Sequence, residues 1–351
     1  MTEPVDAEII APLGSPLGAA VLACADLDRA VDFYGERIGF DVGPVRHWDD
    51  PALAVLAAGP PGLAARSCLL TSSVDPVGQI LLLQFVGASG AVLPGQPIHT
   101  TSNSRGVGLA NLNFYSANLR ATTTEFRAAG FEFWTDPTIH DMSGAVGKPI
   151  EVLFDGPDGV AINLVELAST DPTTRIGQMR AFVERHGRNR RGLTPVVTTS
   201  HVVRSIAASR AFYERVLGMK PLIDVELNAP ESNAFLRLPT DARTHIVFMQ
   251  GNHMFGKLAL SEPLNYLEQC VDLAARAHAP NRGYLAQIFE VDDVGVAYWA
   301  CREVNAVGVT APTELQIPGF GRRRGLVVRA PGSGALQWLI SRNLAHTETR
   351  L

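Results

Sequence analysis

The sequence predicts an α+β protein built from four repeated modules, each a strand, a helix and three further strands, arranged as two pairs. The first observation is the stretch ADLDRAVDFYGERIGF at residues 25–40, where an Asp-Leu-Asp turn precedes a short amphipathic helix that ends at a Gly. The second is its return at residues 205–219 as SIAASRAFYERVLGM, with the same Phe-Tyr pair and the same terminal Gly. Looser copies at residues 118–131 and 292–309 bring the number of repeated modules to four.

Length and composition limit the class of protein. A chain of 351 residues is long for one hydrophobic core, which favours two domains. The hydrophobic share of 46% and the charged share of 19% are typical of a globular protein. The net charge of −5 argues against a nucleic-acid partner. The four Cys form no CxxC pair, so they indicate neither a zinc site nor a disulfide framework.

The N-terminus favours a cytoplasmic protein. It reads MTEPVDAE, which is acidic where a secretion signal would be basic. No apolar run reaches the roughly 18–20 residues that span a bilayer, so we expect no membrane partner.

The predicted N-terminal domain covers residues 1–168, with modules at 16–87 and 106–168. In the first module, Asp26 is the predicted N-cap of a helix that ends at Gly39. In the second module, Gly130 ends the helix and the turn Gly156-Pro157-Asp158-Gly159 joins the last two strands. The strands expected in this half are residues 17–23, 40–45, 66–71, 78–86, 108–115 and 131–135, followed by the pair that flanks the turn.

A polar linker at residues 169–193, with a short helix at 174–186, separates the halves. The predicted C-terminal domain covers residues 194–351, with modules at 194–250 and 283–341. Strands are expected at residues 196–203, 221–227, 234–238, 244–250 and 284–291, together with a final pair like that of the second module. The stretch 251–283 reads as an insertion with a helix at 264–277.

The repeated module with its Phe-Tyr helix and its Pro-Asp-Gly turn resembles the vicinal oxygen chelate superfamily, which includes glyoxalase I, extradiol dioxygenases and bleomycin-binding proteins. The resemblance covers the chain apart from its linkers. It implies that each pair of modules curls around a cavity, so that two glyoxalase-like domains hold two cavities. Because this fold hosts many functions, the resemblance is specific for the fold and weak for the reaction.

In metal-binding relatives, each module supplies ligands from its first and last strands. Carried over by the resemblance, the first-strand positions are Ala19, Asn111, Thr198 and Ala286, and the last-strand positions are Gln84, Asn163, Gln250 and Gln337. None of these residues is a His or a carboxylate, and transition metals need such ligands. We therefore predict no metal ligands, and we expect the carboxamides and Thr198 to bind substrate, together with Tyr284 from the aromatic residues that line the cavities.

Candidate catalytic residues cluster in the second half. His245 and His253 lie near the end of the third module, and either is a general base if it reaches a cavity. Arg322 begins the run Arg322-Arg323-Arg324 before the last strand pair, where one Arg could clamp an anionic substrate group. Each has a plainer interpretation, a hydrogen-bonded histidine or a solvated charge run. His140, in the long loop of the second module, reads as a loop residue.

The preferred function is a small-molecule lyase or isomerase that removes a proton next to a carbonyl or phenol of a hydrophobic, possibly aromatic, oxygenated substrate. In this reading no cofactor is needed. A non-catalytic ligand-sequestering protein is the alternative. The third reading is a ring-cleaving dioxygenase that holds a divalent transition metal such as Fe, Mn or Zn through non-standard ligands. A homodimer and a pairing of the halves within one chain both stay open.

Overall fold

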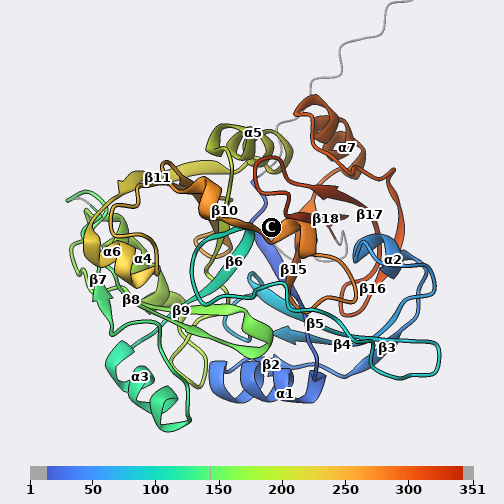
Figure 1. Cartoon of the computed structure of the whole chain (residues 1–351), viewed down its shortest axis with the longest axis horizontal. Helices are drawn as coiled ribbons and strands as arrows, with labels where there is room; N and C mark the ends of the chain where they lie inside the picture. The colour runs from blue at the N-terminus through green and yellow to red at the C-terminus, as the bar shows by residue number, and fades with distance from the viewer. Residues whose placement is uncertain (1–13, 143, 343–351) are drawn as a thin grey trace, which may run out of the picture.

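The computed structural model describes residues 14–142 and 144–342 and contains two nine-stranded mixed sheets. The first sheet has the order β16-β17-β18-β15-β1-β5-β4-β2, with β3 paired to β4, and the second has the order β11-β12-β13-β10-β6-β9-β8-β7, with β14 paired to β6. Figure 1 shows the second sheet with α3, α4 and α6 on the left and the first sheet with α2 and α7 on the right. The α+β class predicted from the sequence is confirmed.

The strands of the first sheet are β1 (Leu17–Ala23), β2 (Asp41–Val42), β3 (Arg46–Trp48), β4 (Ala64–Thr71), β5 (Gln79–Val86), β15 (Gly283–Val291), β16 (Thr313–Ile317), β17 (Gly321–Arg329) and β18 (Leu336–Ser341). Those of the second are β6 (Gly106–Tyr115), β7 (Thr138–Ile139), β8 (Ile150–Asp155), β9 (Ala161–Glu166), β10 (Thr198–Val202), β11 (Lys220–Leu227), β12 (Thr244–Gln250), β13 (Lys257–Pro263) and β14 (Val271–Asp272).

The helices are α1 (Leu27–Asp32), which continues as the π-helix Phe33–Ile38, α2 (Ala52–Leu56), α3 (Leu119–Ala128), α4 (Arg175–His186), α5 (Ile206–Leu217), α6 (Pro230–Phe235) and α7 (Val294–Glu303). In the described residues no helix is both long enough and apolar enough to cross a membrane.

One helix follows the first strand of each module, and a polar side chain begins each of them. The N-caps are Asp26, Asn118, Ser205 and Asp293, and each side chain accepts a hydrogen bond from a backbone amide of the first turn. Such caps satisfy amides that have no partner within the helix. The expected N-cap Asp26 and the expected linker helix, which is α4, are both present.

The sheets pair the modules in an order that we did not expect. The first module joins the fourth, because β1 runs antiparallel to β15, and the second joins the third, because β10 lies beside β6. The expected pairing of neighbouring modules within residues 1–168 and within 194–351 is therefore wrong. Each half contributes one module to each sheet, so the strands of neither half complete a sheet alone.

Neighbouring modules meet through their helices. Phe33 at the end of α1 contacts Phe126 of α3 and Phe154 of β8, with ring centroids 6.4 and 6.3 Å apart. In the second half, α5 packs beside α7 (Figure 1). The Phe-Tyr pairs Phe33-Tyr34 and Phe212-Tyr213 are buried in the core between the sheets, which confirms the structural reading of these repeated residues.

The two sheets differ in what fills their concave faces. Inside the first sheet, the Trp338 indole Nε1 donates a hydrogen bond to the Leu56 carbonyl of α2 over 2.8 Å, and Trp48 packs against the Trp338 ring. These groups join a buried apolar cluster with Ala19 and Ala286. Side chains and α2 thus occupy the space where one of the two predicted cavities was expected.

Several local predictions differ from the structure. The strand expected at residues 131–135 is absent, and that segment forms only an isolated bridge between Phe133 and Phe154. The third module extends past residue 250, because β13 lies inside the stretch taken for an insertion. The helix expected at 264–277 is absent; that segment has short 3₁₀ turns and the strand β14, which pairs with β6. Residues 234–238, expected as a strand, begin at the end of α6. In each case contacts with distant strands override the local pattern.

Candidate functional site

A cavity of about 130 Å³ lies against the concave face of the second sheet. Strands β6, β8 and β9 of the second module form one wall, and β10, β11, β12 and β13 of the third module form the other. Ile176 and Met179 of α4 and Phe235 of α6 also line it. Most of the remaining lining is apolar: Met142, Val165, Leu167, Ile223, Leu227, Leu236, Leu238, Ile246 and Phe248. The candidate site therefore belongs to both halves, which corrects our expectation of a cavity within the second half.

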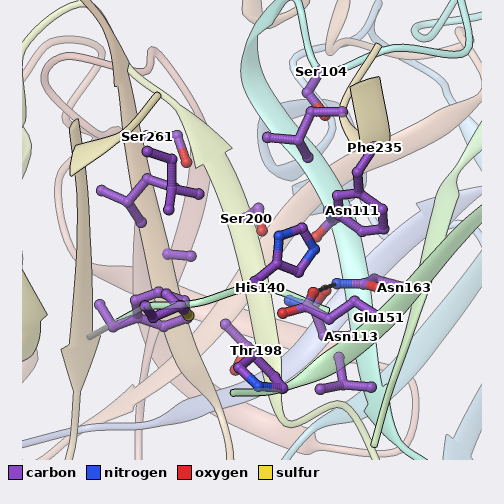
Figure 2. A pocket seen from close by; sticks show the side chains of 18 of the residues that line it. Ser104, Asn111, Asn113, His140, Glu151, Asn163, Thr198, Ser200, Phe235 and Ser261 are labelled. Atoms are coloured by element: carbon purple, nitrogen blue, oxygen red, sulfur yellow. Dashed lines mark hydrogen bonds between the residues drawn. The ribbon is translucent and has the colours of Figure 1, made fainter. Parts of the chain in front are cut away.

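Polar side chains gather on the wall that the second module provides (Figure 2). Asn113 and Asn163 are register partners on the parallel strands β6 and β9, and Asn111 lies two residues before Asn113 on the same face. The Asn163 amide Nδ2 donates to Glu151 Oε2 over 2.5 Å. The other amide atom of Asn163, Oδ1, stays available to accept a hydrogen bond. Within the described residues, Oδ1 of all three asparagines is buried without a hydrogen-bond partner. Buried polar groups are usually satisfied, so these oxygens fit a ligand or water.

His140 also faces the cavity. Its ring is 4% exposed and lies edge-on against Phe235, with centroids 4.6 Å apart. Nδ1 hydrogen-bonds the Ser232 hydroxyl over 3.0 Å, whereas the buried Nε2 has no partner in the described part of the chain. Figure 2 shows the ring close to Asn111 and Phe235. The Ser232 contact fixes the ring and leaves one nitrogen for a proton transfer.

Lys257 is the first residue of β13, and it lines the cavity at 1% exposure. Its register partner on β10 is Thr198, so the two side chains lie next to each other on one face. The ammonium donates to the Met254 carbonyl and lies 5.6 Å from the centroid of the Tyr115 ring. Burial lowers the pKa of Lys257 to about 7, because an apolar surrounding disfavours the charged form.

Three residues expected to bind substrate, Asn111, Asn163 and Thr198, do line the cavity. Gln250 does not: it ends β12, beyond the lining residues Ile246 and Phe248 that share its face. Tyr284 and Gln337 lie outside the cavity as well, on strands of the first sheet.

Tyr284 and Gln337 belong to a buried polar network between the sheets. Gln337 donates to Gln287 over 3.0 Å, and Gln287 donates to Thr199 and to the Tyr284 hydroxyl. The network reaches His201, whose pKa burial lowers to about 3, so that its ring is neutral. Trp338, one residue after Gln337, faces the concave side instead. A shift of one residue along a strand moves a side chain to the opposite face, which explains the wrong placement of Gln337.

The predicted bases do not reach the cavity. His245 alternates with the lining residues Thr244 and Ile246, so it points to the other face of β12, where it pairs with Asp224 over 2.7 Å. His253 is likewise absent from the lining, and its Nε2 lies 3.0 Å from the buried Asp75. The expected convergence of these two histidines on one cavity is therefore not observed.

Arg322 lies far from the cavity in the fold, on β17 of the first sheet. Its side chain is 79% exposed, and its nearest acidic partner is Glu314 at 3.9 Å. It does not line the cavity of the second sheet. Arg322 therefore cannot bind an anionic substrate group in this cavity. It fits the plainer interpretation, a solvated run of charged residues.

The residues of the cavity do not fit the transition-metal centre that the fold family implies. The first and last strands of the two modules, which carry the ligands in metal-binding relatives, here present Asn113, Asn163, Thr198 and Lys257 to the cavity. Amides, a hydroxyl and an ammonium are poor ligands for transition metals. The nearby carboxylate of Glu151 is hydrogen-bonded to Asn163.

Asp75, His186 and His253 form a second group with ligand atoms within 4.8 Å of one another. However, the Phe255 amide donates to His253 Nδ1 over 3.0 Å, so the ring proton lies on Nε2. This nitrogen therefore has no lone pair for an ion, and it donates to Asp75 instead. The group forms a junction in which Asp75 of the first module is hydrogen-bonded to His253 of the third module and lies 3.6 Å from His186 of α4.

The sequence reasoning missed several polar residues of the cavity, among them Asn113, Lys257, His140 and Glu151. Lys257 was overlooked because residues 251–283 were read as an insertion, although it is one of only three lysines in the chain. His140 was read as a loop residue, and Glu151 was read as part of a strand pair without a role. The run KLALSEP, a charge that begins an apolar strand pattern, was the available signal for Lys257.

Comparisons with known proteins agree with this fold. Residues 17–164 match the profile of the Glyoxalase/Bleomycin resistance protein/Dioxygenase superfamily. Glyoxalase I from Zea mays matches with a TM-score of 0.53 and 14% identity over 93% of this chain and 92% of that chain. A mutant form of the same enzyme gives a TM-score of 0.55 at the same identity over 93% of this chain and 92% of that one.

A putative dioxygenase from Bacillus subtilis gives a TM-score of 0.55 at 10% identity over 96% of this chain and 88% of that chain. At such identities the likeness shows the fold alone. No curated protein matches the sequence significantly.

Proposed function

We infer that the cavity of the second sheet is the active site of a small-molecule lyase or isomerase. The match of residues 17–164 to the profile of the Glyoxalase/Bleomycin resistance protein/Dioxygenase superfamily supports a small-molecule site of this kind. The observation that carries this proposal is His140, whose buried Nε2 has no hydrogen-bond partner among residues 14–142 and 144–342 and which faces the same apolar cavity as the buried Lys257. A base and a cation in one water-poor cavity suit proton abstraction next to a carbonyl or a phenol.

In the proposed reaction, His140 Nε2 accepts the proton from the carbon next to the carbonyl, and the electron pair moves onto the carbonyl oxygen. The Lys257 ammonium stabilises the negative charge that develops on that oxygen. Asn111, Asn163 and Thr198 hydrogen-bond the polar groups of the substrate and orient it. Return of the proton to another carbon completes an isomerisation, and loss of a group from the neighbouring carbon completes an elimination.

The walls favour a hydrophobic and aromatic substrate. The cavity volume of about 130 Å³ is close to the roughly 150 Å³ of a protein cavity that binds benzene. Apolar side chains make up more than half of the lining, and its amide and carboxylate groups all lie on β6, β8 and β9. Such a distribution suits a molecule with one apolar body and one oxygenated end.

Deuterium exchange tests the proposal. The protein is incubated in D₂O with aromatic ketones and aldehydes that carry exchangeable α-protons, and the loss of the α-proton signal is followed by NMR. We expect His140→Gln to slow exchange by about 10²-fold or more, because it removes the base while Gln can still bond Ser232. His245→Gln is the matched control, since His245 does not line the cavity, and it should leave the rate unchanged. Equal rates in wild type and His140→Gln would contradict the proposal.

A cavity-filling variant checks the location of the site. Ala259 lines the cavity on β13, and Ala259→Leu should abolish exchange with little loss of stability, because the added atoms enter open space. Ala286→Leu, its control, adds the same atoms to the filled interior of the first sheet and should destabilise the protein without blocking the site. Unchanged exchange in Ala259→Leu would show that the reaction occurs elsewhere.

A non-catalytic ligand-binding protein is the second candidate. The three unpartnered asparagine oxygens and the mostly apolar walls support tight binding of an oxygenated molecule even without a proton transfer. Saturable binding of the same ketones without any α-proton exchange would favour this function over catalysis.

A further inference from the structure

The three lysines of the chain occupy very different surroundings. Lys148 is 62% exposed at its side chain and pairs with Asp141 over 2.7 Å. Lys220 is exposed at the start of β11. Lys257 alone among them is buried, and it lines the cavity of the second sheet.

The surroundings of Lys257 leave its amine without a counter-charge. Within the described residues no carboxylate forms an ion pair with it, and its one hydrogen bond goes to the Met254 carbonyl. The ring of Tyr115 and the hydroxyl-bearing Thr198 lie beside it. A desolvated lysine with no anionic partner favours the neutral amine, which is a nucleophile, and the lowered pKa of about 7 agrees with this.

We propose that the Lys257 amine forms a reversible imine with an aldehyde or ketone held in the cavity. The amine nitrogen adds to the carbonyl carbon, and its proton passes to the oxygen. The second proton on nitrogen leaves as the carbinolamine loses water, so that one C=N bond replaces one C=O bond and water is the other product. The reaction needs no oxidant or reductant.

The apolar walls favour the imine over the free reactants. They limit the water that would hydrolyse the C=N bond, and Thr198, the register partner of Lys257, offers a hydroxyl on the same face for the proton transfers. An imine also withdraws electrons from the neighbouring carbon. The inference therefore rests on the same cavity and deepens the proposed proton abstraction by His140: the protonated imine nitrogen accepts the electron pair in place of the carbonyl oxygen, and Lys257 no longer acts as a separate ammonium. The inference limits the substrate class to aldehydes and ketones and leaves out phenols.

Reductive trapping tests the inference. The full-length protein is incubated at pH 7 with benzaldehyde and cyanoborohydride, which reduces an imine to a stable benzylamine, and the adducts are located by peptide mass spectrometry. We expect Lys257 to carry at least about tenfold more adduct than Lys148 or Lys220, because ordinary lysines are almost wholly protonated at this pH. Lys257→Arg, which keeps the charge but cannot form the imine, should lose this adduct.

Two outcomes would overturn the inference. One is labelling of Lys148 or Lys220 as fast as Lys257, which would mean that the cavity gives the amine no special reactivity. The other is a folded protein with no adduct at Lys257. In that case α-proton exchange that still depends on His140 would retain the proposed function, with Lys257 acting only as a cation. Trapping at Lys257 without any exchange would instead retain the imine and reject the proposed reaction.

Discussion

Gln287 on β15 donates a hydrogen bond to the Thr199 hydroxyl on β10 over 2.7 Å, and this contact joins the two sheets of the molecule. Both side chains are fully buried. Gln287 also donates to the Tyr284 hydroxyl and accepts from Gln337, so one amide satisfies three polar groups in the core between the sheets. A buried network of this kind is favourable only while every member has its partners.

We expect Gln287→Leu to destabilise the fold by about 1–3 kcal/mol, because it leaves buried polar partners without a hydrogen bond. The free energy of unfolding from urea titration measures the effect. Gln250→Leu is the matched control, since the Gln250 Oε1 has no partner to lose within the described residues. A change for Gln287→Leu no larger than that for Gln250→Leu would show that the network does not stabilise the contact between the sheets.

The crossed pairing of modules predicts that the halves depend on each other. A fragment of residues 1–187 lacks β15 beside β1, and one of residues 188–351 lacks β6 beside β10. We expect neither fragment alone to unfold cooperatively as a monomer, whereas an equimolar mixture should recover the cooperative transition. Size-exclusion chromatography and urea unfolding followed by near-UV circular dichroism measure this.

The control for the fragments is the full chain cleaved at a protease site inserted after Gly187, whose halves should stay associated. A monomeric 188–351 fragment with a cooperative transition of its own would instead support the division at residues 169–193 into two independent domains.

The pKa of Lys257 predicts a pH-dependent stability. The pKa is about 7 in the folded protein, against 10.5 for an ordinary lysine. Between these values the unfolded chain binds a proton that the folded chain does not, so raising the pH stabilises the wild type, by at most about 1.4 kcal/mol per pH unit. Lys257→Met has no such dependence. We therefore expect the free energy of unfolding of Lys257→Met to exceed that of the wild type by the largest amount below pH 7. This difference should shrink as the pH rises toward 10.

Urea titrations of wild type and Lys257→Met at several pH values between 6 and 10 measure this difference. Lys220→Met, at an exposed position on β11, is the control and should show no trend. A constant difference between Lys257→Met and wild type over this range would mean that the buried amine is protonated throughout.

The junction at Asp75 predicts a loss of stability in acid. Burial alone would raise the pKa of Asp75, but hydrogen bonds from His253 and from the Val77 amide outweigh it and hold the pKa below the usual 3.8. The ionised carboxylate therefore stabilises the fold above about pH 4, and this contribution is lost as the pH falls through the folded pKa. We expect Asp75→Ala to cost about 1.5–3 kcal/mol at neutral pH and less below pH 4.

The exposed pair of Asp224 and His245 supplies the control for Asp75. Its carboxylate is 56% exposed, and exposed ion pairs contribute little, so Asp224→Ala should change the unfolding free energy only slightly. Equal effects of Asp75→Ala and Asp224→Ala at neutral pH would mean that burial adds nothing to the strength of the junction.

Much of the fold follows from local patterns. Asp26, Asn118, Ser205 and Asp293 each begin a helix, because a short polar side chain at that position can satisfy the first free amides. The helix-ending glycines Gly39 and Gly218 both adopt the left-handed conformation that favours glycine. These signals lie within a few residues of one another, so the sequence alone is enough to count four modules and to set the class.

The site depended on longer-range relationships. Asn111, Asn163 and Thr198 could be predicted through the resemblance, because in relatives the first and last strands of each module supply the residues that line the cavity. Gln337 could not be placed correctly, since a shift of one residue reverses the face of a strand and only the pairing of β18 with β15 sets the register. His140 came from a loop whose position over the cavity depends on α6, a distant segment.

The sequence by itself therefore determined the repeated module, its helix boundaries, the α+β class and three of the polar residues of the cavity. The tertiary structure decided which modules share a sheet. It also placed α2 and Trp338 on the concave face of the first sheet, and His140 and Lys257 in the cavity of the second sheet. The physical reason is one of range. Caps, turns and helical periodicity act between residues close in the chain, whereas sheet pairing and cavity filling depend on contacts between segments that the sequence separates by a hundred residues or more.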